Sequence, residues 1–271
     1  MPELPEVEAI VRGLREDGLE GSRLKSASVL RATVTRPQDP AYVEALSSNV
    51  TVKRVERRAK NILIHLGNGS TIKVHLRMSG GIAIYGASHE SPPTARAVWT
   101  LSRGRRLIFT DFRALGNIHV HPTSELAELL SHLGPEPLSR AFTADQFIAR
   151  ARNSRLPAKL YLMDQSKVAG LGNIYAVEAL FHAGISPQRL MNSIRSSRLA
   201  TLHGAIKETL RRAVHSVYKT YRSPSRYRPH LGEFKRFVYG RAGEPCLRCG
   251  RPIQRIKQAG RSTYYCSHCQ R

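Results

Sequence analysis

The four cysteines are the residues whose spacing most directly indicates chemistry. They stand as "CLRC" (246–249) and "CSHC" (266–269), near the end of the chain. Two C-x2-C pairs at this separation are typical of a tetrahedral site in which four thiolates hold one zinc ion. Because the protein fills every coordination position, we expect one structural Zn2+ rather than a catalytic metal or a thiol redox site. Its predicted ligands are Cys246, Cys249, Cys266 and Cys269.

A short basic stretch lies between the two cysteine pairs and carries Arg251, Arg255, Lys257 and Arg261. A module too small to form a core of its own can be held together by metal. Such a module presents its basic side chains to a partner, or it is simply a solvated basic hairpin.

The first residues, "MPELPEVE", suggest a second kind of chemistry. We expect the initiator methionine to be removed, because the next residue, Pro2, is small. This exposes a secondary amine, and an α-amine titrates near neutral pH. The positive end of a helix dipole further disfavours its ammonium form. Attack of such an amine on C1′ of a sugar gives an iminium cation directly.

Two glutamates accompany this amine. Glu3 and Glu6 are three residues apart, so they share one face of a helix. Carboxylates in that position can move protons and offset the charge of an iminium ion. The alternative is that Pro2 and the glutamates only start the helix well.

The composition indicates a polyanionic partner. The 271 residues include 43 Lys and Arg against 20 Asp and Glu, a net charge of +23. An excess of this size points to nucleic acid, or to a charge that keeps the protein in solution. No apolar run approaches the roughly 20 residues of a membrane span, and no signal peptide is present. We therefore expect no membrane partner, and a cytoplasmic location at the bacterial nucleoid.

The elements that must position these groups follow from periodicity. Val7, Ile10, Val11 and Leu14 form one apolar stripe, which predicts a helix over 5–16. From about 23 to 121 the pattern is typical of strands: 50–56, 61–66 and 71–76 alternate, and so do "WTLS" and "RLIFT" around residues 103–105. Residues 67–70 are a predicted turn. An antiparallel β-sandwich follows.

The second half of the chain has the sequence pattern of helices rather than strands. Residues 132–142 read as a linker, and 143–221 as helices, starting with a capping box of Thr143 and Gln146. The stretch 222–235 is basic and is a predicted loop, and 236–271 is a short strand with the cysteine module.

Five motifs together resemble the formamidopyrimidine-DNA glycosylase family, and the resemblance runs from Pro2 to Gln270. They are "MPELPEVE", "RRAKNILIHL", "HLRMSG", "MDQSKVAGLGNIYAVEALFHAGISP" and "YGRAGEPCLRCGRPI…AGRSTYYCSHCQ". The resemblance implies an α+β multidomain fold: an N-terminal antiparallel β-sandwich flanked by helices, a helix–two-turn–helix domain and a C-terminal zinc ribbon. The predicted boundaries are 1–131 for the catalytic domain, 132–150 for the linker and the start of the helical domain, 151–235 for the DNA-binding helices and 236–271 for the zinc finger.

The resemblance also assigns catalytic roles. Pro2 matches the nucleophile that forms a Schiff base, and Glu3 the acid that protonates the deoxyribose ring oxygen. Glu6 matches a supporting acid. Lys60 matches the lysine that assists base loss and β-elimination; elsewhere it would be read as an ordinary strand lysine. Arg261 matches the arginine that grips phosphates and assists the last elimination.

Further residues match contacts to double-stranded DNA. The predicted phosphate contacts are His75, Asn173, Tyr239 and Arg255. Lys159, with Arg152 and Arg155, matches part of a backbone clamp, unless these three form a solvated helix face. Glycosylases extrude the damaged base, and this family fills the void with a Met, Arg and Phe wedge. Met78 and Arg113 match the first two, and Leu115 stands at the third; Met78 as a plain core residue is the alternative.

Three departures from the family bear on the substrate. Leu115 replaces the wedge phenylalanine, Arg96 stands in a stretch where a DNA-contacting histidine is usual, and 218–237 lacks the usual capping-loop sequence. The sequence predicts a monomeric DNA glycosylase and AP lyase that acts on oxidised purines in duplex DNA. The alternatives are the same chemistry on hydantoins, oxidised pyrimidines or abasic sites, and a non-catalytic zinc-ribbon DNA-binding protein.

Overall fold

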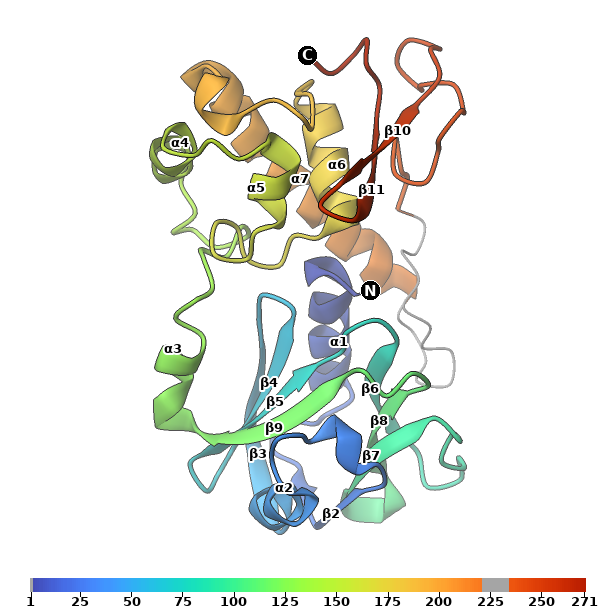
Figure 1. Cartoon of the computed structure of the whole chain (residues 1–271). Helices are drawn as coiled ribbons and strands as arrows, with labels where there is room; N and C mark the ends of the chain where they lie inside the picture. Colours follow the sequence, from blue (N-terminus) through green and yellow to red (C-terminus); the bar gives the residue numbers. More distant parts are fainter. Residues whose placement is uncertain (1, 221–233) are drawn as a thin grey trace. The chain divides into compact units, whose positions relative to one another are not determined.

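The computed structural model describes residues 2–220 and 234–271. These residues divide into two compact units. Residues 2–131 and 214–220 belong to unit 1, and residues 132–213 and 234–271 to unit 2. Both units can be followed in Figure 1.

Unit 1 is built on two antiparallel sheets. One has five strands in the order β1-β3-β4-β5-β9, and the other has four in the order β2-β7-β8-β6. The strands are β1 (Arg23–Leu24), β2 (Ser26–Val29), β3 (Val50–Arg58), β4 (Asn61–Leu66), β5 (Ser70–His75), β6 (Gly80–Tyr85), β7 (Ala95–Thr100), β8 (Arg106–Asp111) and β9 (Asn117–Pro122). The predicted sandwich is thus confirmed, with β4 at the predicted bounds.

Two connections cross from one sheet to the other side by side. Residues 76–79 lead from β5 to β6, and residues 112–116 lead from β8 to β9. His75 is the register partner of Asn117, and Gly80 is that of Asp111. Both connections therefore begin and end on paired residues, so they must lie next to each other.

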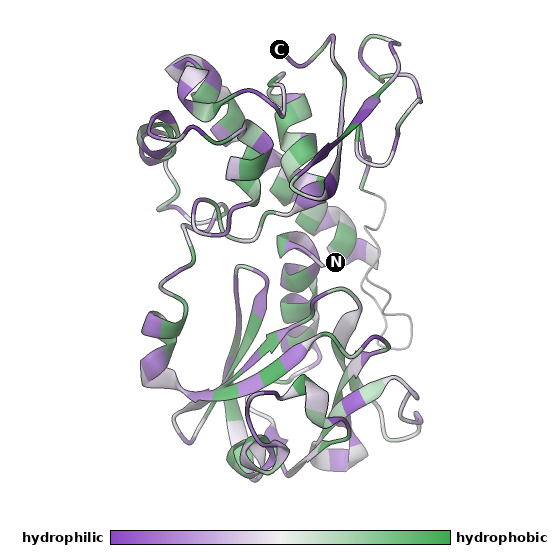
Figure 2. Cartoon of the chain, in the orientation of Figure 1, coloured by the Kyte–Doolittle hydropathy of each residue, from purple (hydrophilic) through white to green (hydrophobic). Residues whose placement is uncertain are grey.

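Helix α1 (Leu4–Glu16) lies against β3, β4 and β6. Its apolar stripe is fully buried: Val7, Ile10 and Leu14 are 0% exposed. These residues join the alternating inward side chains of the strands in one core. Figure 2 shows the strand pattern directly, with hydrophobic and hydrophilic residues alternating along β9.

One helix of unit 1 lies in the stretch where the sequence pattern favours strands. Helix α2 (Pro40–Ser47) has Pro40 in its first turn, and its N-cap Asp39 accepts a hydrogen bond from the Ala41 N–H at 2.8 Å. A proline in the first turn and an aspartate cap are strong helix-start signals. They outweigh the surrounding strand pattern. A short helix, α3 (Leu126–Leu129), follows β9.

Unit 2 combines helices with a small hairpin. The helices are α4 (Ala144–Arg152), α5 (Ala158–Met163), α6 (Asn173–His182) and α7 (Ser196–Thr220), the last of which belongs to unit 1 from Val214 onward. At the start of α4 the Thr143 hydroxyl accepts from the Gln146 N–H, the first half of the predicted capping box. The hairpin consists of β10 (Gln254–Gln258) and β11 (Arg261–Tyr265).

The zinc-ribbon segment packs on α6 rather than standing alone. Its buried residues form one cluster with two residues of that helix: Val177, Phe181, Val238, Cys246, Ile253 and Cys266. Helix α6 is apolar along most of its length (Figure 2). Most of the predicted loop 222–235 lies outside the described residues. Among the helices that the structure does describe, none combines the length and apolar character of a membrane span.

Candidate functional site

The beginning of α1 holds its carboxylates in a closed arrangement. Glu3 is the N-cap, and Glu3 and Glu6 form a reciprocal capping box in which each side chain accepts from the other residue's backbone N–H. The Glu3 N–H to Glu6 Oε2 distance is 2.8 Å. Pro2, Glu3 and Glu6 are all buried. Pro2 therefore directly precedes the capped start of the helix; Met1 lies outside the described residues.

Polar contacts along α1 show which way its N-terminal end points. Arg15, near the end of the helix, donates to the Val55 carbonyl at 2.7 Å. Glu8, two turns earlier, accepts from Arg57 Nε at 2.9 Å. The start of α1 therefore lies nearer to the end of β3, where the β3–β4 turn follows. This turn carries Lys60, so the first residues of α1 and Lys60 lie at the same end of unit 1. Figure 1 shows the start of α1 and the β3–β4 turn at this end.

Lys60 and His75 belong to this same end. Asn61, which follows Lys60, is the register partner of His75 on β5. Burial lowers the pKa of His75 to about 4, and the charges of Arg77, Lys73 and Lys60 act in the same direction. The imidazole is therefore neutral near pH 7, among cations, and its Nδ1 accepts from the Arg77 N–H at 3.1 Å. Such a site suits an anionic ligand that brings in the missing negative charge.

The two side-by-side connections carry the predicted wedge. Met78, Arg113 and Leu115 are exposed, with Met78 at 46% and Leu115 at 48%. The alternative of Met78 as a core residue is wrong. One fully buried carboxylate, Asp111, ties the connections together: it accepts from the Ser79 hydroxyl on one side, and on the other from the Arg113 N–H at 3.1 Å and the Gly116 N–H at 2.7 Å.

In unit 2, two residues of the helical part hold the tip of the zinc hairpin. Lys159 Nζ lies 2.7 Å from Thr263 Oγ1 and 3.3 Å from the Ser262 carbonyl, which also accepts from Asn173 Nδ2 at 2.9 Å. Lys159 is 0% exposed. Burial, and then the charge of Arg261, lower the pKa of Lys159 to about 8.

The hairpin turn itself places Arg261. Both turn residues, Ala259 and Gly260, have positive φ (46° and 76°), as a two-residue type I′ turn requires. Arg261 follows directly and is exposed, while Arg255 Nε donates to the Ser262 hydroxyl at 3.1 Å. Lys159 and Asn173 thus fix the backbone next to Arg261 from the outside of the hairpin.

A buried carboxylate on α6 anchors the entry to the zinc module. Glu178 is 0% exposed and accepts three backbone N–H groups, from Phe237 at 2.9 Å, Val238 at 3.0 Å and Tyr239 at 2.8 Å. Burial raises the pKa of Glu178, and the three donors oppose that shift. This contact fixes the backbone of Tyr239, one of the predicted phosphate contacts.

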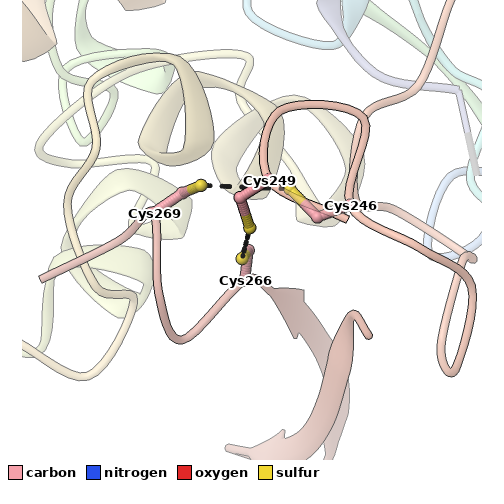
Figure 3. A group of neighbouring side chains, drawn as sticks. All are labelled: Cys246, Cys249, Cys266 and Cys269. Carbon is pink, nitrogen blue, oxygen red and sulfur yellow. Dashed lines mark hydrogen bonds between the residues drawn. The ribbon is translucent and has the colours of Figure 1, made fainter. Parts of the chain in front are cut away.

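The four cysteines converge as the spacing predicts (Figure 3). All four sulfur atoms lie within 4.8 Å of one another, with Cys246 and Cys269 at 4.0 Å and Cys249 and Cys266 at 3.5 Å. Zinc–sulfur bonds of about 2.3 Å in a tetrahedron put sulfurs about 3.8 Å apart. The donor set therefore fits one zinc ion.

Comparison with known proteins agrees with this arrangement. Residues 1–118 match the formamidopyrimidine-DNA glycosylase N-terminal domain, residues 133–224 the H2TH domain of the same enzyme, and residues 243–271 a zinc finger found in FPG and IleRS. The chain belongs to the formamidopyrimidine-DNA glycosylase family. It is 39% identical to the formamidopyrimidine-DNA glycosylase of Desulforamulus reducens over 276 residues, covering 100% of this chain and 99% of that protein.

Solved structures of the family are similar over nearly the whole chain. One is the Lactococcus lactis Fpg bound to DNA containing N7-benzyl-Fapy-dG, with a TM-score of 0.90, 31% identity and 99% of each chain covered. Another is the same protein with DNA containing an abasic site, with a TM-score of 0.89, 31% identity and 99% of each chain covered. The predicted fold class of the family is confirmed.

Within this family framework, each unit gathers its own share of the predicted residues. Unit 1 holds Pro2, Glu3, Glu6, Lys60, His75, Met78, Arg113 and Leu115, and unit 2 holds Lys159, Asn173, Tyr239, Arg255, Arg261 and the four cysteines. Two functional residues were not predicted from the sequence: Asp111, which positions the connections that carry Met78 and Arg113, and Glu178, which positions the backbone of Tyr239. A lone acid inside an apolar stretch, as in "NIYAVEALF", was the available signal for Glu178.

Proposed function

We propose that this chain is a base-excision-repair DNA glycosylase and AP lyase that removes oxidised purines, ring-opened formamidopyrimidines first among them, from double-stranded DNA. One observation supports this most strongly. Helix α1 presents buried Pro2, with Glu3 and Glu6, at the end of unit 1 where Lys60 and His75 also lie. A secondary amine with acids and cations nearby suits attack on a sugar carbon whose neighbours are phosphates.

In the proposed mechanism the nitrogen of Pro2 attacks C1′, and the damaged base leaves with the electron pair of its bond to C1′ and takes up the proton that the nitrogen gives up. Glu3 donates a proton to the ring oxygen, which opens the deoxyribose and leaves an iminium ion on C1′. Its charge is offset by the carboxylates of Glu3 and Glu6. Loss of a C2′ proton then releases the 3′ phosphate by β-elimination, which Lys60 assists, and δ-elimination releases the 5′ phosphate.

Unit 2 supplies the proposed grip on DNA. Arg261, Arg255, Tyr239 and Asn173 contact phosphates, and the zinc ion, held by the four cysteines, keeps the hairpin folded without taking part in the reaction. Lys159 is buried within unit 2, so its proposed part in the clamp is to hold the backbone beside Arg261. Acting on chromosomal DNA, the enzyme would work in the bacterial cytoplasm, at the nucleoid.

Borohydride trapping tests the chemistry. Incubation with an abasic duplex and borohydride should reduce the iminium ion and leave a covalent protein–DNA adduct. Peptide mapping should locate the attached DNA on Pro2. Pro2→Gly, which leaves a primary amine in place of the secondary one, should form the adduct much more slowly while still binding the duplex. Glu3→Gln should bind damaged DNA but excise its base at least about 100-fold more slowly. The mass of the N-terminal peptide shows whether Met1 is removed; full activity with Met1 retained contradicts the assignment.

Residues 218–237 lack the capping-loop sequence that is usual in the family. This difference favours a second set of candidate substrates, namely hydantoins, oxidised pyrimidines or abasic sites. Most of that segment lies outside the described residues. A panel of duplexes with formamidopyrimidine, 8-oxoguanine, hydantoin, oxidised pyrimidine or abasic lesions ranks the substrates by single-turnover rate. A chain that binds all of these and traps none is the non-catalytic zinc-ribbon protein.

A further inference from the structure

Phe112 is an exposed aromatic residue on the same connection as the predicted wedge residues Arg113 and Leu115. Among the described residues of unit 1, five large hydrophobic side chains are exposed, and three of them lie on the two side-by-side connections: Met78, Phe112 and Leu115. Phe112 is the most exposed of the five, at 68%. A phenylalanine so exposed, beside two other apolar side chains, marks an interaction surface rather than a scattered surface residue.

The backbone under Phe112 is held in a fixed shape. Asp111, the residue before it, is fully buried and bonds both connections. Ala114 adopts φ +50°, in the left-handed region that few alanines occupy, and packs partly buried on the core. A Cβ on Gly116 would meet the Phe109 ring at 2.7 Å, so this turn lies tightly on β8. The turn therefore presents Phe112 on ordered backbone, so that binding has only the side chain left to order.

The surroundings of Phe112 indicate what covers it. Arg113 follows it on the same turn and Arg77 precedes Met78 on the neighbouring one, and both side chains are exposed. No acidic residue is exposed on either connection, 76–79 or 112–116. An apolar patch flanked by guanidinium groups matches stacked bases between two phosphate backbones.

We propose that Phe112 stacks on a base of the pair next to the extruded nucleotide, supplying the aromatic face that Leu115 lacks. This inference rests on the proposed function. An aliphatic side chain fills a void but has no π face, whereas an aromatic ring on a base contributes stacking that tolerates any sequence. The wedge of this chain then consists of Met78, Arg113, Leu115 and Phe112. Its aromatic side chain stands three residues before position 115, where the family has its phenylalanine.

Single-turnover excision from a formamidopyrimidine duplex tests the proposal. Phe112→Ala should slow excision on the order of tenfold. Phe112→Tyr should stay within about threefold of the wild type, and Phe112→Leu should resemble Phe112→Ala, because stacking rather than apolar volume is the property lost. Adding Leu115→Phe to Phe112→Ala should restore most of the rate. Leu30→Ala, at a 55% exposed residue outside both connections, is the matched control and should leave the rate unchanged.

A pre-formed abasic site separates extrusion from the later steps. It has no base to unstack, so Phe112→Ala should cleave it at close to the wild-type rate. A photoreactive benzophenone residue at position 112 should crosslink to a nucleotide flanking the lesion, and the same group at position 30 should not.

The outcomes are distinguishable. If the wild type excises and traps normally while Phe112→Ala excises the damaged base at the same rate, or crosslinks map away from the lesion, the role of Phe112 is refuted and the proposed function stands. If the wild type itself neither excises nor traps, the proposed function fails first. If Phe112→Ala instead converts a sedimenting dimer to a monomer with unchanged excision, the patch is a self-association surface and the proposal is overturned.

Discussion

Lys159 donates to Thr263 across 2.7 Å, so a fully buried lysine of α5 is bonded to the strand that begins with Arg261. The chain has a net charge of +23, and a lysine on its surface could meet DNA directly. This one is used inside unit 2, where it fixes the backbone of an exposed arginine.

Replacement of Lys159 by methionine should therefore weaken the function of Arg261 indirectly. Methionine keeps the apolar stem but loses both hydrogen bonds to the hairpin. We expect strand cleavage at an abasic site to slow roughly 10- to 100-fold, because small displacements of a catalytic group are costly. Zinc content should stay at one ion per chain. Thr263→Val, which removes the acceptor instead, should act in the same direction, and unchanged cleavage in both variants contradicts the positioning role.

The lowered pKa of Lys159 predicts a pH dependence of stability. Its pKa is about 8 in the folded chain against 10.5 in the unfolded one. Between these values the unfolded state binds more protons, so the unfolding free energy rises as the pH increases from 8 to 10.5, by up to about 3 kcal/mol. Denaturant unfolding of wild type and Lys159→Met across this range measures the difference. Parallel curves for the two proteins contradict the prediction.

Glu178→Gln tests the anchor of the zinc module. The amide offers one acceptor oxygen to a place where three backbone N–H groups converge, and its own NH2 group faces donors. We expect unit 2 to lose about 2–3 kcal/mol of unfolding free energy. Hydrogen exchange at residues 237–239 should accelerate far more than in the β10–β11 ladder. Equal acceleration everywhere points to general destabilisation instead.

In the free protein, His75 should remain neutral at pH values well below 6.5, the ordinary pKa of a histidine. With a pKa of about 4, its ring is uncharged at pH 5, and stability falls as the pH drops from 6.5 to about 4 because the unfolded chain binds the proton first. Proton NMR of the imidazole measures this directly. Arg77→Ala should raise the pKa, and so should bound DNA, whose phosphates oppose the neighbouring cations. An ordinary His75 titration near 6.5 refutes the assignment.

Removal of zinc should abolish DNA binding and cleavage together. Chelation releases four thiolates and leaves the module with a small cluster on α6 and the hydrogen bonds of Glu178, Lys159 and Asn173, a weak support for a segment this short. A zinc-sensitive dye should report one ion per chain, and a thiol reagent four reactive cysteines afterward. Re-addition of zinc should restore binding. Activity that survives complete removal shows that the hairpin folds without metal.

Periodicity and residue spacing were sufficient to predict the elements whose signal lies within a short stretch of the sequence. The apolar stripe of α1, strand β4 and the cysteine pairs are each legible within about twenty residues. Asp111 is different, because its partner Ser79 lies 32 residues away, and only strand register brings the two connections together. The burial of Lys159 likewise depends on a hairpin more than a hundred residues later in the chain. Long-range packing of this kind leaves no local signature.

The single tryptophan gives this protein an unusual experimental advantage. Trp99 is 1% exposed in the core of unit 1, with its indole N–H bonded to the Ser47 hydroxyl at 2.9 Å, whereas every cysteine belongs to unit 2. Selectively excited tryptophan fluorescence therefore follows the melting of the sandwich alone, and thiol accessibility follows the finger alone. A single unlabelled sample can thus reveal whether the two halves unfold in one cooperative step or in two.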